Sequence, residues 1–301
     1  MGIALGANQY GKAENRVVRI YRDTERHEIV DLNVSSSLRG DFSAAHISGD
    51  QADVLPTDTQ KNTAFAYAKC HGVSSPEDYA LALGRRLLEA APKAQSVQIR
   101  VEQYPWDRIT VNGEGHDHAF VRRGDAVRTA AVTVSGRAAD ERVHVISGIK
   151  DLVLLKSTGS EFRGFLKDQY TTLQETDDRI LATSLVAMWR HGGCDCDWNA
   201  SHARVRSALL ETFASTYSRA LQETLYAMGQ RALEVEPDAV EIRFSAPNKH
   251  HFLVDLEPFG LANENEVFIA ADRPYGLIEA TVVRDDAPGA EDAWLALPAF
   301  I

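Results

Sequence analysis

Residues 75–101, SPEDYALALGRRLLEAAPKAQSVQIRV, carry the pattern that decides the fold class. Ser75 is a suitable helix N-cap, because the residue after it is a proline, which is favoured at the first helical position. Apolar residues then recur every four positions, which predicts a helix with one stripe facing a core, and Pro92 ends it. From Val97 to Val101 apolar and polar residues alternate, which predicts a strand with one solvated face. The residues of the helical stripe, four positions apart, are Tyr79, Leu83 and Leu87.

Both halves of the chain show the same order of elements. Before the opening stretch, the sequence predicts strands at Arg16–Arg22 and His27–Ser35, joined by the polar turn Asp23–Arg26. In the second half, a long helical region runs from His202 to Leu233 and leads into an alternating strand at Val240–Phe244. The strand candidates before that helical region are Val143–Ser147, Leu152–Lys156 and Leu181–Trp189. The apolar stripe expected on the helical region consists of Val205, Leu209, Phe213 and Tyr217.

Strands, then helices, then strands in each half predict an α+β fold with antiparallel sheets and helices packed on one face. The polar stretch Gly136–Arg142 separates the two rounds. We therefore expect two domains, residues 1–140 and 141–301.

Composition narrows the classes of function. The 301 residues carry a formal net charge of −11, without a basic run, which disfavours nucleic acid and anionic membranes as partners. An anionic substrate would have to be bound by a few local cations. No apolar run is long enough to span a bilayer. We expect a cytoplasmic protein, because residues 1–14 lack a signal-peptide pattern and Ala299–Ile301 is not a peroxisomal signal.

Histidines and cysteines offer two weak metal-site candidates. One is the group of His191, Cys194 and Cys196, with His202 beyond, but a single C-x-C pair favours a loop with incidental thiols. The other is the His116/His118 pair, which would share one face of a strand, although no third ligand is suggested nearby. The small, odd number of cysteines fits a reducing compartment. The sequence contains no G-x-G-x-x-G motif, P-loop or G-x-S-x-G motif.

Four segments are rich in chemically capable residues, and each also has a structural interpretation. Thr57-Asp58 would suit a helix N-cap, Pro247-Asn248 a turn, and Phe162 and Phe165 a core. Arg179 would suit a surface ion pair with Glu175, Asp177 or Asp178. The segments are Gln9–Lys12, Leu55–Thr63, Leu154–Arg179 and Ala246–Phe252.

Together these segments resemble the urate oxidase family, over nearly the whole chain. The family contains, in this order, the elements Y-G-K, P-T-D-T-x-K-N-T, S-T-x-S-x-F-x-G-F-L-x-D-x-Y-T-T-L-x-E-T-x-D-R and P-N-K-H. The resemblance implies two tandem tunnelling-fold domains per subunit and a homotetramer with active sites between subunits. It also implies oxidation of urate by molecular oxygen to 5-hydroxyisourate and hydrogen peroxide, with no cofactor and no metal.

The resemblance assigns substrate-binding roles to matching positions. Arg179 would present a planar fork of donors to the urate anion, which a lysine cannot imitate. Gln222, beside Leu221, would clamp the purine edge with a donor and an acceptor, although a solvent-facing helical glutamine is an alternative. Phe162 would stack on the ring, and Asp58 would contribute its backbone N–H.

The resemblance further assigns a proton relay to Lys12, Thr57 and His250, with Asn248 holding dioxygen and later water. Removing a further proton from urate gives an electron-rich dianion that reduces oxygen directly. His251 follows His250 where the family usually has an aromatic residue. Two alternatives remain open: another tunnelling-fold purine or pterin enzyme, of the cyclohydrolase or pterin-synthase kind, and a non-catalytic urate-binding homologue.

Overall fold

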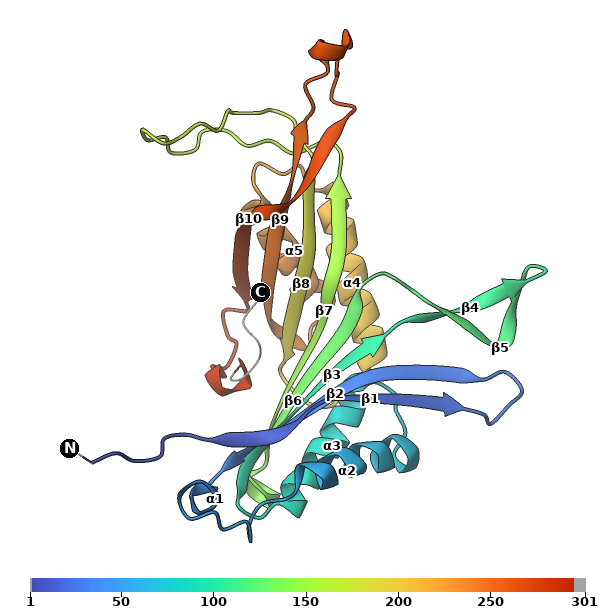
Figure 1. Cartoon of the computed structure of the whole chain (residues 1–301), viewed down its shortest axis with the longest axis vertical. Coiled ribbons are helices and arrows are strands. Elements are labelled where there is room, and N and C mark those ends of the chain that lie inside the picture. Colours follow the sequence, from blue (N-terminus) through green and yellow to red (C-terminus); the bar gives the residue numbers. More distant parts are fainter. Residues whose placement is uncertain (1, 295–301) are drawn as a thin grey trace. The chain divides into compact units, whose positions relative to one another are not determined.

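The computed structural model describes residues 2–294, and one order of elements occurs in it twice (Figure 1). The residues Ala299–Ile301, considered above for a targeting signal, lie outside the described part. The first round comprises β1 (Gln9–Tyr21), β2 (Glu28–Gly40), α2 (Thr57–Cys70), α3 (Pro76–Ala90), β3 (Ala94–Tyr104) and β6 (Val127–Ser135). The second comprises β7 (Arg142–Lys156), β8 (Leu181–His191), α4 (Trp198–Ser215), α5 (Leu221–Val235), β9 (Ala239–Leu253) and β10 (Phe268–Val283).

Four strands and two helices thus form each round, with the helices between the second and third strands. The additional elements are short: α1 (Ser43–Ile47), β4 (Trp106–Val111), β5 (Glu114–Arg122) and three 3-10 turns at Ala138–Asp140, Glu257–Phe259 and Glu291–Trp294.

By their contacts, the described residues form two compact units. The first contains the chain up to Gly148, Trp189–His202 and the segment from Pro288 onward; the second contains Ile149–Met188 and Ala203–Ala287. Hydrogen-bonded strands follow the order β1-β2-β3-β6-β7 in the first unit and β7-β8-β9-β10 in the second, so that β7 takes part in both. The expected α+β class with antiparallel strands is confirmed.

In the first unit, the opening stretch of the sequence behaves as predicted. The hydroxyl of Ser75 accepts a hydrogen bond from the Asp78 amide at 3.0 Å, which caps α3. The predicted stripe of α3 is fully buried and packs with Val97, Ile99 and Val101 of β3 in one core. The face of β3 that was expected to be solvated is partly buried, because Gln98 donates to the Thr133 hydroxyl of β6 at 3.1 Å.

In the second unit, the predicted long helical region is two helices. Val205, Leu209 and Phe213 are buried on α4 as expected. Tyr217 is 55% exposed, because α4 ends at Ser215 and Tyr217 lies in the connection to α5. The assignment of Tyr217 to the apolar stripe was therefore wrong.

Strand boundaries also differ from the prediction. The candidates Val143–Ser147 and Leu152–Lys156 are one strand, β7, in which Asp151 adopts a positive φ of 59°. The predicted turn at Pro247-Asn248 was wrong, since both residues lie inside β9 and pair with β10. Strands β4, β5, β6 and β10 were not predicted.

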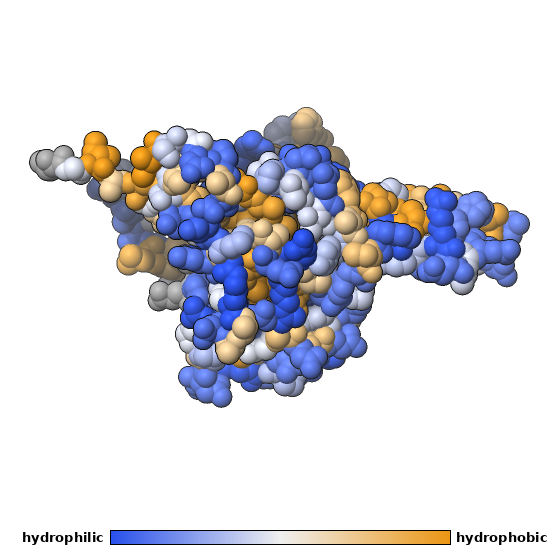
Figure 2. All heavy atoms as spheres, turned by 90° about the horizontal axis from the view of Figure 1, so that it is seen from below, coloured by the Kyte–Doolittle hydropathy of each residue, from blue (hydrophilic) through white to orange (hydrophobic). Residues whose placement is uncertain are grey.

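Strands β4 and β5 form a separate two-stranded sheet that extends from the first unit, here called the arm (Figure 1). Seen from below, the projecting part of the first unit, which includes the arm and the neighbouring β1–β2 hairpin, shows hydrophobic residues beside hydrophilic ones (Figure 2). The exposed apolar residues of the arm include Ile109, Val111 and Val121.

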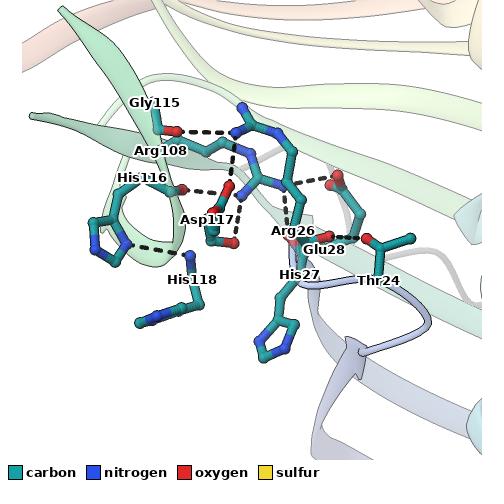
Figure 3. A network of polar contacts seen from close by, with 9 residues as sticks. All are labelled: Thr24, Arg26, His27, Glu28, Arg108, Gly115, His116, Asp117 and His118. Carbon is teal, nitrogen blue, oxygen red and sulfur yellow. Dashed lines mark hydrogen bonds and ion pairs between the residues drawn. The ribbon is translucent and has the colours of Figure 1, made fainter.

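The arm is fastened to the turn between β1 and β2 (Figure 3). Arg108 of β4 donates to the His27 and Asp117 carbonyls and to the Glu28 carboxylate. The His27 amide donates to the same Asp117 carbonyl at 2.9 Å. Arg26 adds a bond to the Gly115 carbonyl at 2.9 Å.

None of the helices in the described part of the chain combines the length and the apolar character that a membrane crossing requires.

Candidate active site

Lys12 lies on β1, in the first unit, where the register with β2 shifts between Lys12 and Asn15. Its backbone amide donates to the Ser36 hydroxyl at 3.4 Å, and this hydroxyl donates to the side-chain oxygen of Gln60 on α2 at 2.8 Å. Gln60 in turn donates to the Leu55 carbonyl at 3.2 Å. The strand that carries Lys12 is thereby tied to the start of α2.

Tyr10 makes a second connection between the same segments. Its hydroxyl donates to the Leu55 carbonyl at 3.1 Å, and its ring lies edge-on against Phe42 with 4.8 Å between centroids. Burial raises the pKa of the Tyr10 phenol, so it stays a donor. Two of the four sequence segments are thus joined in space.

Thr57 is the first residue of α2, and the N-cap position is occupied by Pro56. The expectation that Thr57 caps the helix was therefore wrong. Thr57 and Asp58 are both exposed. The pKa of the Asp58 carboxyl is lowered, mainly by the hydrogen bond from Lys61 and its charge, with a smaller effect of the Lys12 charge. Lys12 therefore lies near enough to this helix start to act on it electrostatically.

Arg179 and Phe162 lie together in the second unit. The guanidinium carbon of Arg179 lies 5.0 Å from the centroid of the Phe162 ring. The Arg179 amide donates to the Ser160 carbonyl at 2.8 Å, and its Nε to the Ser160 hydroxyl at 3.4 Å. Phe162 and Thr176 exchange backbone hydrogen bonds of 2.9 and 3.1 Å. The segment 157–180 is therefore fixed without regular secondary structure.

The acidic residues beside Arg179 bind other partners. Asp177 pairs with Arg163, Glu175 with Lys167 at 3.0 Å, and the Asp178 carboxylate accepts from the Thr158 hydroxyl at 2.9 Å. The surface ion pairs considered for Arg179 are thus replaced by contact with an aromatic ring. Burial lowers the pKa of its guanidinium, which nevertheless remains charged at neutral pH.

Phe162 is half-buried rather than part of the core, and it stacks on Phe165 with 4.9 Å between centroids and 14° between planes. The interpretation of both phenylalanines as core residues on a helix was wrong. A cation beside a partly open aromatic face suits a planar anion.

Leu221 and Gln222 are the first two residues of α5, in the second unit. Leu221 is buried and Gln222 is exposed. Ala220 occupies the N-cap position and has no side chain that could cap the helix. At the outer, solvent-facing side of this helix start, the Glu223 carboxylate accepts a hydrogen bond from the Arg219 amide at 3.0 Å.

Asn248 and His250 lie on β9 and point from alternate residues of one strand, so they share a face. They pair with Gly276 and Ala271 of β10, and the register shifts between these two partners. The His250 ring lies 5.9 Å from that of Phe252. Both side chains are half-buried.

The two metal-site candidates have other contacts. His191 is buried, with Nε2 3.0 Å from the Ser147 hydroxyl, and Cys194 is exposed beside Arg85. Cys196 packs against the core of the first unit. On the arm, the ring of His118 lies 4.5 Å from that of His116 and 5.9 Å from that of His27, so a third histidine is present that the sequence pattern did not suggest. The His118 amide, however, already occupies Nδ1 of His116 at 3.3 Å.

Several residues that support the site were missed in the sequence. Ser36 is 24 residues from its partner Gln60, and Ser160 is 19 residues from Arg179. Gln60 and Ser160 do lie inside two of the four segments, which is the one signal that would have selected them. Serines and glutamines carry no charge pattern, so their role depends on contacts that only the fold supplies.

The repeated order of strands and helices, with an arginine beside an aromatic ring in one unit and a lysine near a helix start in the other, defines a tandem tunnelling-fold protein. The family model described as Uricase matches residues 8–133 and 145–279, and the chain belongs to this family.

Curated relatives cover almost the whole chain. A uricase of Arthrobacter globiformis is 51% identical over 298 residues, covering 99% of this chain and 96% of the relative. A uricase of Danio rerio is 34% identical over 280 residues, covering 91% and 93%.

Solved structures agree with this. The crystal structure of the Arthrobacter globiformis uricase has a TM-score of 0.92 at 52% identity, over 98% of this chain and 99% of that one. A uricase from Bacillus fastidious has a TM-score of 0.82 at 25% identity, over 94% and 96%.

Proposed function

We propose that the protein is a urate oxidase, which converts urate, oxygen and water to 5-hydroxyisourate and hydrogen peroxide. In this reaction urate loses two electrons and gains a hydroxyl from water, while oxygen gains two electrons and two protons. Family membership supports this function, and the observation that carries it in the structure is the Arg179 guanidinium beside the Phe162 ring.

Binding of urate rests on the second unit. Arg179 offers several N–H donors in one plane, and its adjacent acidic residues bind elsewhere, so its charge is available to an anion. Phe162 supplies a face for stacking, which is worth about 1–3 kcal/mol for bases on aromatic residues. Gln222 supplies a donor and an acceptor for the urea-like edge, with Leu221 beside it. These assignments follow the matching positions of the family.

Proton removal rests on Lys12, Thr57 and His250. Lys12, when neutral, takes a proton from bound urate through the Thr57 hydroxyl, and His250 completes the relay. Asp58 contributes its backbone N–H beside Thr57. Asn248 holds oxygen, and then water, with its amide. The resulting dianion transfers electrons directly to oxygen, and the proposal assigns no metal or organic cofactor to this step.

We further propose a homotetramer with active sites shared between subunits. Exposed apolar side chains on the arm and on the β9–β10 hairpin support association with further copies. Those of the hairpin include Phe252, Leu253 and Ile269. The division of the site residues between the two units also supports a shared pocket.

Two smaller expectations belong to the same proposal. Residues 1–140 and 141–301 are the two tunnelling-fold domains, and the repeat that begins again at β7 supports this division. A cytoplasmic location is supported by the cysteines, since Cys70, Cys194 and Cys196 form no disulfide in the described part of the chain.

The alternative of a cyclohydrolase or pterin-synthase activity has no support in the comparisons, which give uricases. A direct experiment tests the proposed function. The purified protein should consume urate, seen as loss of its ultraviolet absorbance, with equimolar uptake of oxygen and release of peroxide.

Exhaustive treatment with chelators should leave that rate unchanged. Failure to consume urate would contradict the proposal. A chelator-induced loss that copper, iron or zinc restores would contradict its cofactor-free mechanism.

A further inference from the structure

Three groups proposed to bind urate come from two segments of the second unit. Phe162 and Arg179 lie in the irregular segment 157–180, and Gln222 is at the start of α5. Segment 157–180 is held internally by the Phe162–Thr176 backbone pair and by Arg179 on Ser160. The position of Gln222 relative to that segment must be fixed by other contacts.

Ser218 makes these contacts through its backbone. The residue forms a parallel bridge with Ser160. The Ser218 amide donates to the Gly159 carbonyl at 3.0 Å, and the Glu161 amide donates to the Ser218 carbonyl at 2.8 Å. Segment 157–180 and the residues leading into α5 are therefore paired directly beside both Phe162 and Arg179.

Side-chain hydroxyls extend the connection into the helix. Thr224 of α5 donates its hydroxyl to that of Ser218 at 2.8 Å, and Ser218 donates to the Ala220 carbonyl at 3.0 Å. On the other side of the bridge, the Ser160 hydroxyl accepts from Arg179 at 3.4 Å. Ser160, Ser218 and Thr224 are each 0% exposed.

Because this network is buried, its hydrogen bonds restrict the positions of its members. A buried hydroxyl without a partner is costly, so each member holds its neighbours in one geometry. Ala220 at the N-cap position makes no side-chain bond, and the inner side of this helix start is bonded through Thr224 and Ser218. The outer side has its own support in the Arg219–Glu223 pair. Loss of the Thr224 hydroxyl would therefore loosen the placement of Gln222 without removing the contact between Glu223 and the Arg219 amide.

We infer that Ser160, Ser218 and Thr224 form a positioning network that sets the spacing of Gln222 relative to Arg179 and Phe162, and so determines affinity for the purine ring. The inference rests on the proposed function and identifies Thr224 as a positioning residue that does not itself contact urate. Its effect should fall on KM more than on kcat, because clamping of the ring is common to the ground state and the transition state.

The test uses Thr224→Val, which keeps the shape of threonine and removes its hydroxyl, and Thr224→Ser, which restores the hydroxyl. Both are measured with urate for KM and kcat, and by calorimetric titration with xanthine, which keeps the dione ring of urate but lacks its 8-oxo group. We expect Thr224→Val to raise KM and the xanthine Kd about tenfold, with kcat changed less than about threefold. Thr224→Ser should return both constants to within about threefold of wild type.

Arg219→Gln is the matched control, since it removes the surface ion pair with Glu223 but keeps the backbone bond from the residue 219 amide to that carboxylate, so both constants should stay unchanged. Thr224→Val with unchanged KM and Kd, or Thr224→Ser impaired as strongly as Thr224→Val, would overturn the network. Should Thr224→Val fail to fold, Ser160→Ala decides, because it removes only the acceptor of Arg179 and must also raise the xanthine Kd. A wild-type protein that leaves urate intact would instead remove the proposed function, and the xanthine titrations would still test the network.

Discussion

The hydroxyl of Tyr10 donates to the carbonyl of Leu55 across 45 residues of sequence, at 3.1 Å. This bond, with the Ser36–Gln60 pair behind it, places the strand of Lys12 beside the segment that leads to Thr57. The relay proposed for the reaction needs these two side chains in one fixed geometry. These polar contacts hold the two segments together within one unit.

Replacement of Lys12 by methionine should affect the chemical step. The variant keeps the length of the side chain but has no base, so kcat should fall at least about 100-fold while xanthine still binds. Steady-state kinetics and calorimetric titration measure the two effects. Lys69→Met, an exposed change near the end of α2, is the control and should behave as wild type. If Lys12→Met changed only KM, the role of Lys12 as the base would be refuted.

Gly11 tests how closely the two strands must approach. A Cβ atom at this position would lie 1.8 Å from the Ser36 carbonyl oxygen, so Gly11→Ala must push β1 away from β2. We expect a loss of stability of about 1–3 kcal/mol and a fall in kcat, because Lys12 moves with the strand. Gly124→Ala is the matched control, since a Cβ there meets nothing within 4 Å. The free energy of unfolding and kcat are measured for both variants by denaturant unfolding and steady-state kinetics. Equal stability of the two variants would contradict the packing argument.

Arg179→Lys keeps the positive charge of the site and removes the planar fork of donors. We expect weaker urate binding and slower turnover, with kcat/KM lowered about 10–100-fold, since a charge-assisted fork acts in both ground and transition states. Arg163→Lys, in the same segment but on the exposed Asp177 pair, should retain activity. Full activity of Arg179→Lys would show that charge alone is enough.

How far the sequence predicts this protein depends on the range of the interactions. The helix at Ser75 was predicted accurately because its cap, its proline and its stripe are all local. The break between α4 and α5 was missed because Ser218 leaves the helix to pair with Gly159 and Glu161, which are distant in sequence. Arg179 seemed to have three acidic partners nearby, yet each of these binds elsewhere and Arg179 contacts Phe162. Local pattern selected the residue, and tertiary contacts determined what it touches.

Mixed oligomers test the shared pocket. Thr57→Ala and Arg179→Ala proteins should each be severely impaired, but co-expressed chains should regain part of the activity. If chains mix at random, roughly a quarter of the pockets receive an intact Thr57 from one subunit and an intact Arg179 from another. Particles that carry both of two different affinity tags are isolated and assayed. Mixed particles that remain as inactive as either parent would exclude a pocket shared between subunits.

The burial of Lys156 leads to a prediction about how the stability of the folded chain depends on pH. Its ammonium donates to the carbonyls of Phe213 and Thr216 at the end of α4, and burial lowers its pKa from 10.5. Below the lowered pKa, both folded and unfolded chains are protonated and the folded chain bears the cost of a desolvated charge. Between the lowered and the ordinary pKa the unfolded chain binds more protons, so stability rises with pH.

The melting temperature of the wild type, relative to that of Lys156→Met, should therefore increase as the pH rises toward 10.5, the ordinary pKa of lysine. The same comparison with Lys69→Met, on an exposed site, should give a constant difference. A relative melting temperature that falls over this range would contradict the assigned direction.

The arm is held by the β1–β2 turn as well as by its covalent base, and this has a consequence for association. A two-stranded hairpin joined only at its base would sample many orientations, and a partner would have to select one of them at an entropic cost. Here both strands of the arm are bonded to the β1–β2 connection. β5 is held by Arg26 and by the His27–Asp117 backbone contact, and β4 by Arg108. The exposed side chains of Ile109, Val111 and Val121 are thus held in one orientation before a partner binds. Much of the conformational entropy that association would otherwise cost is already lost during folding.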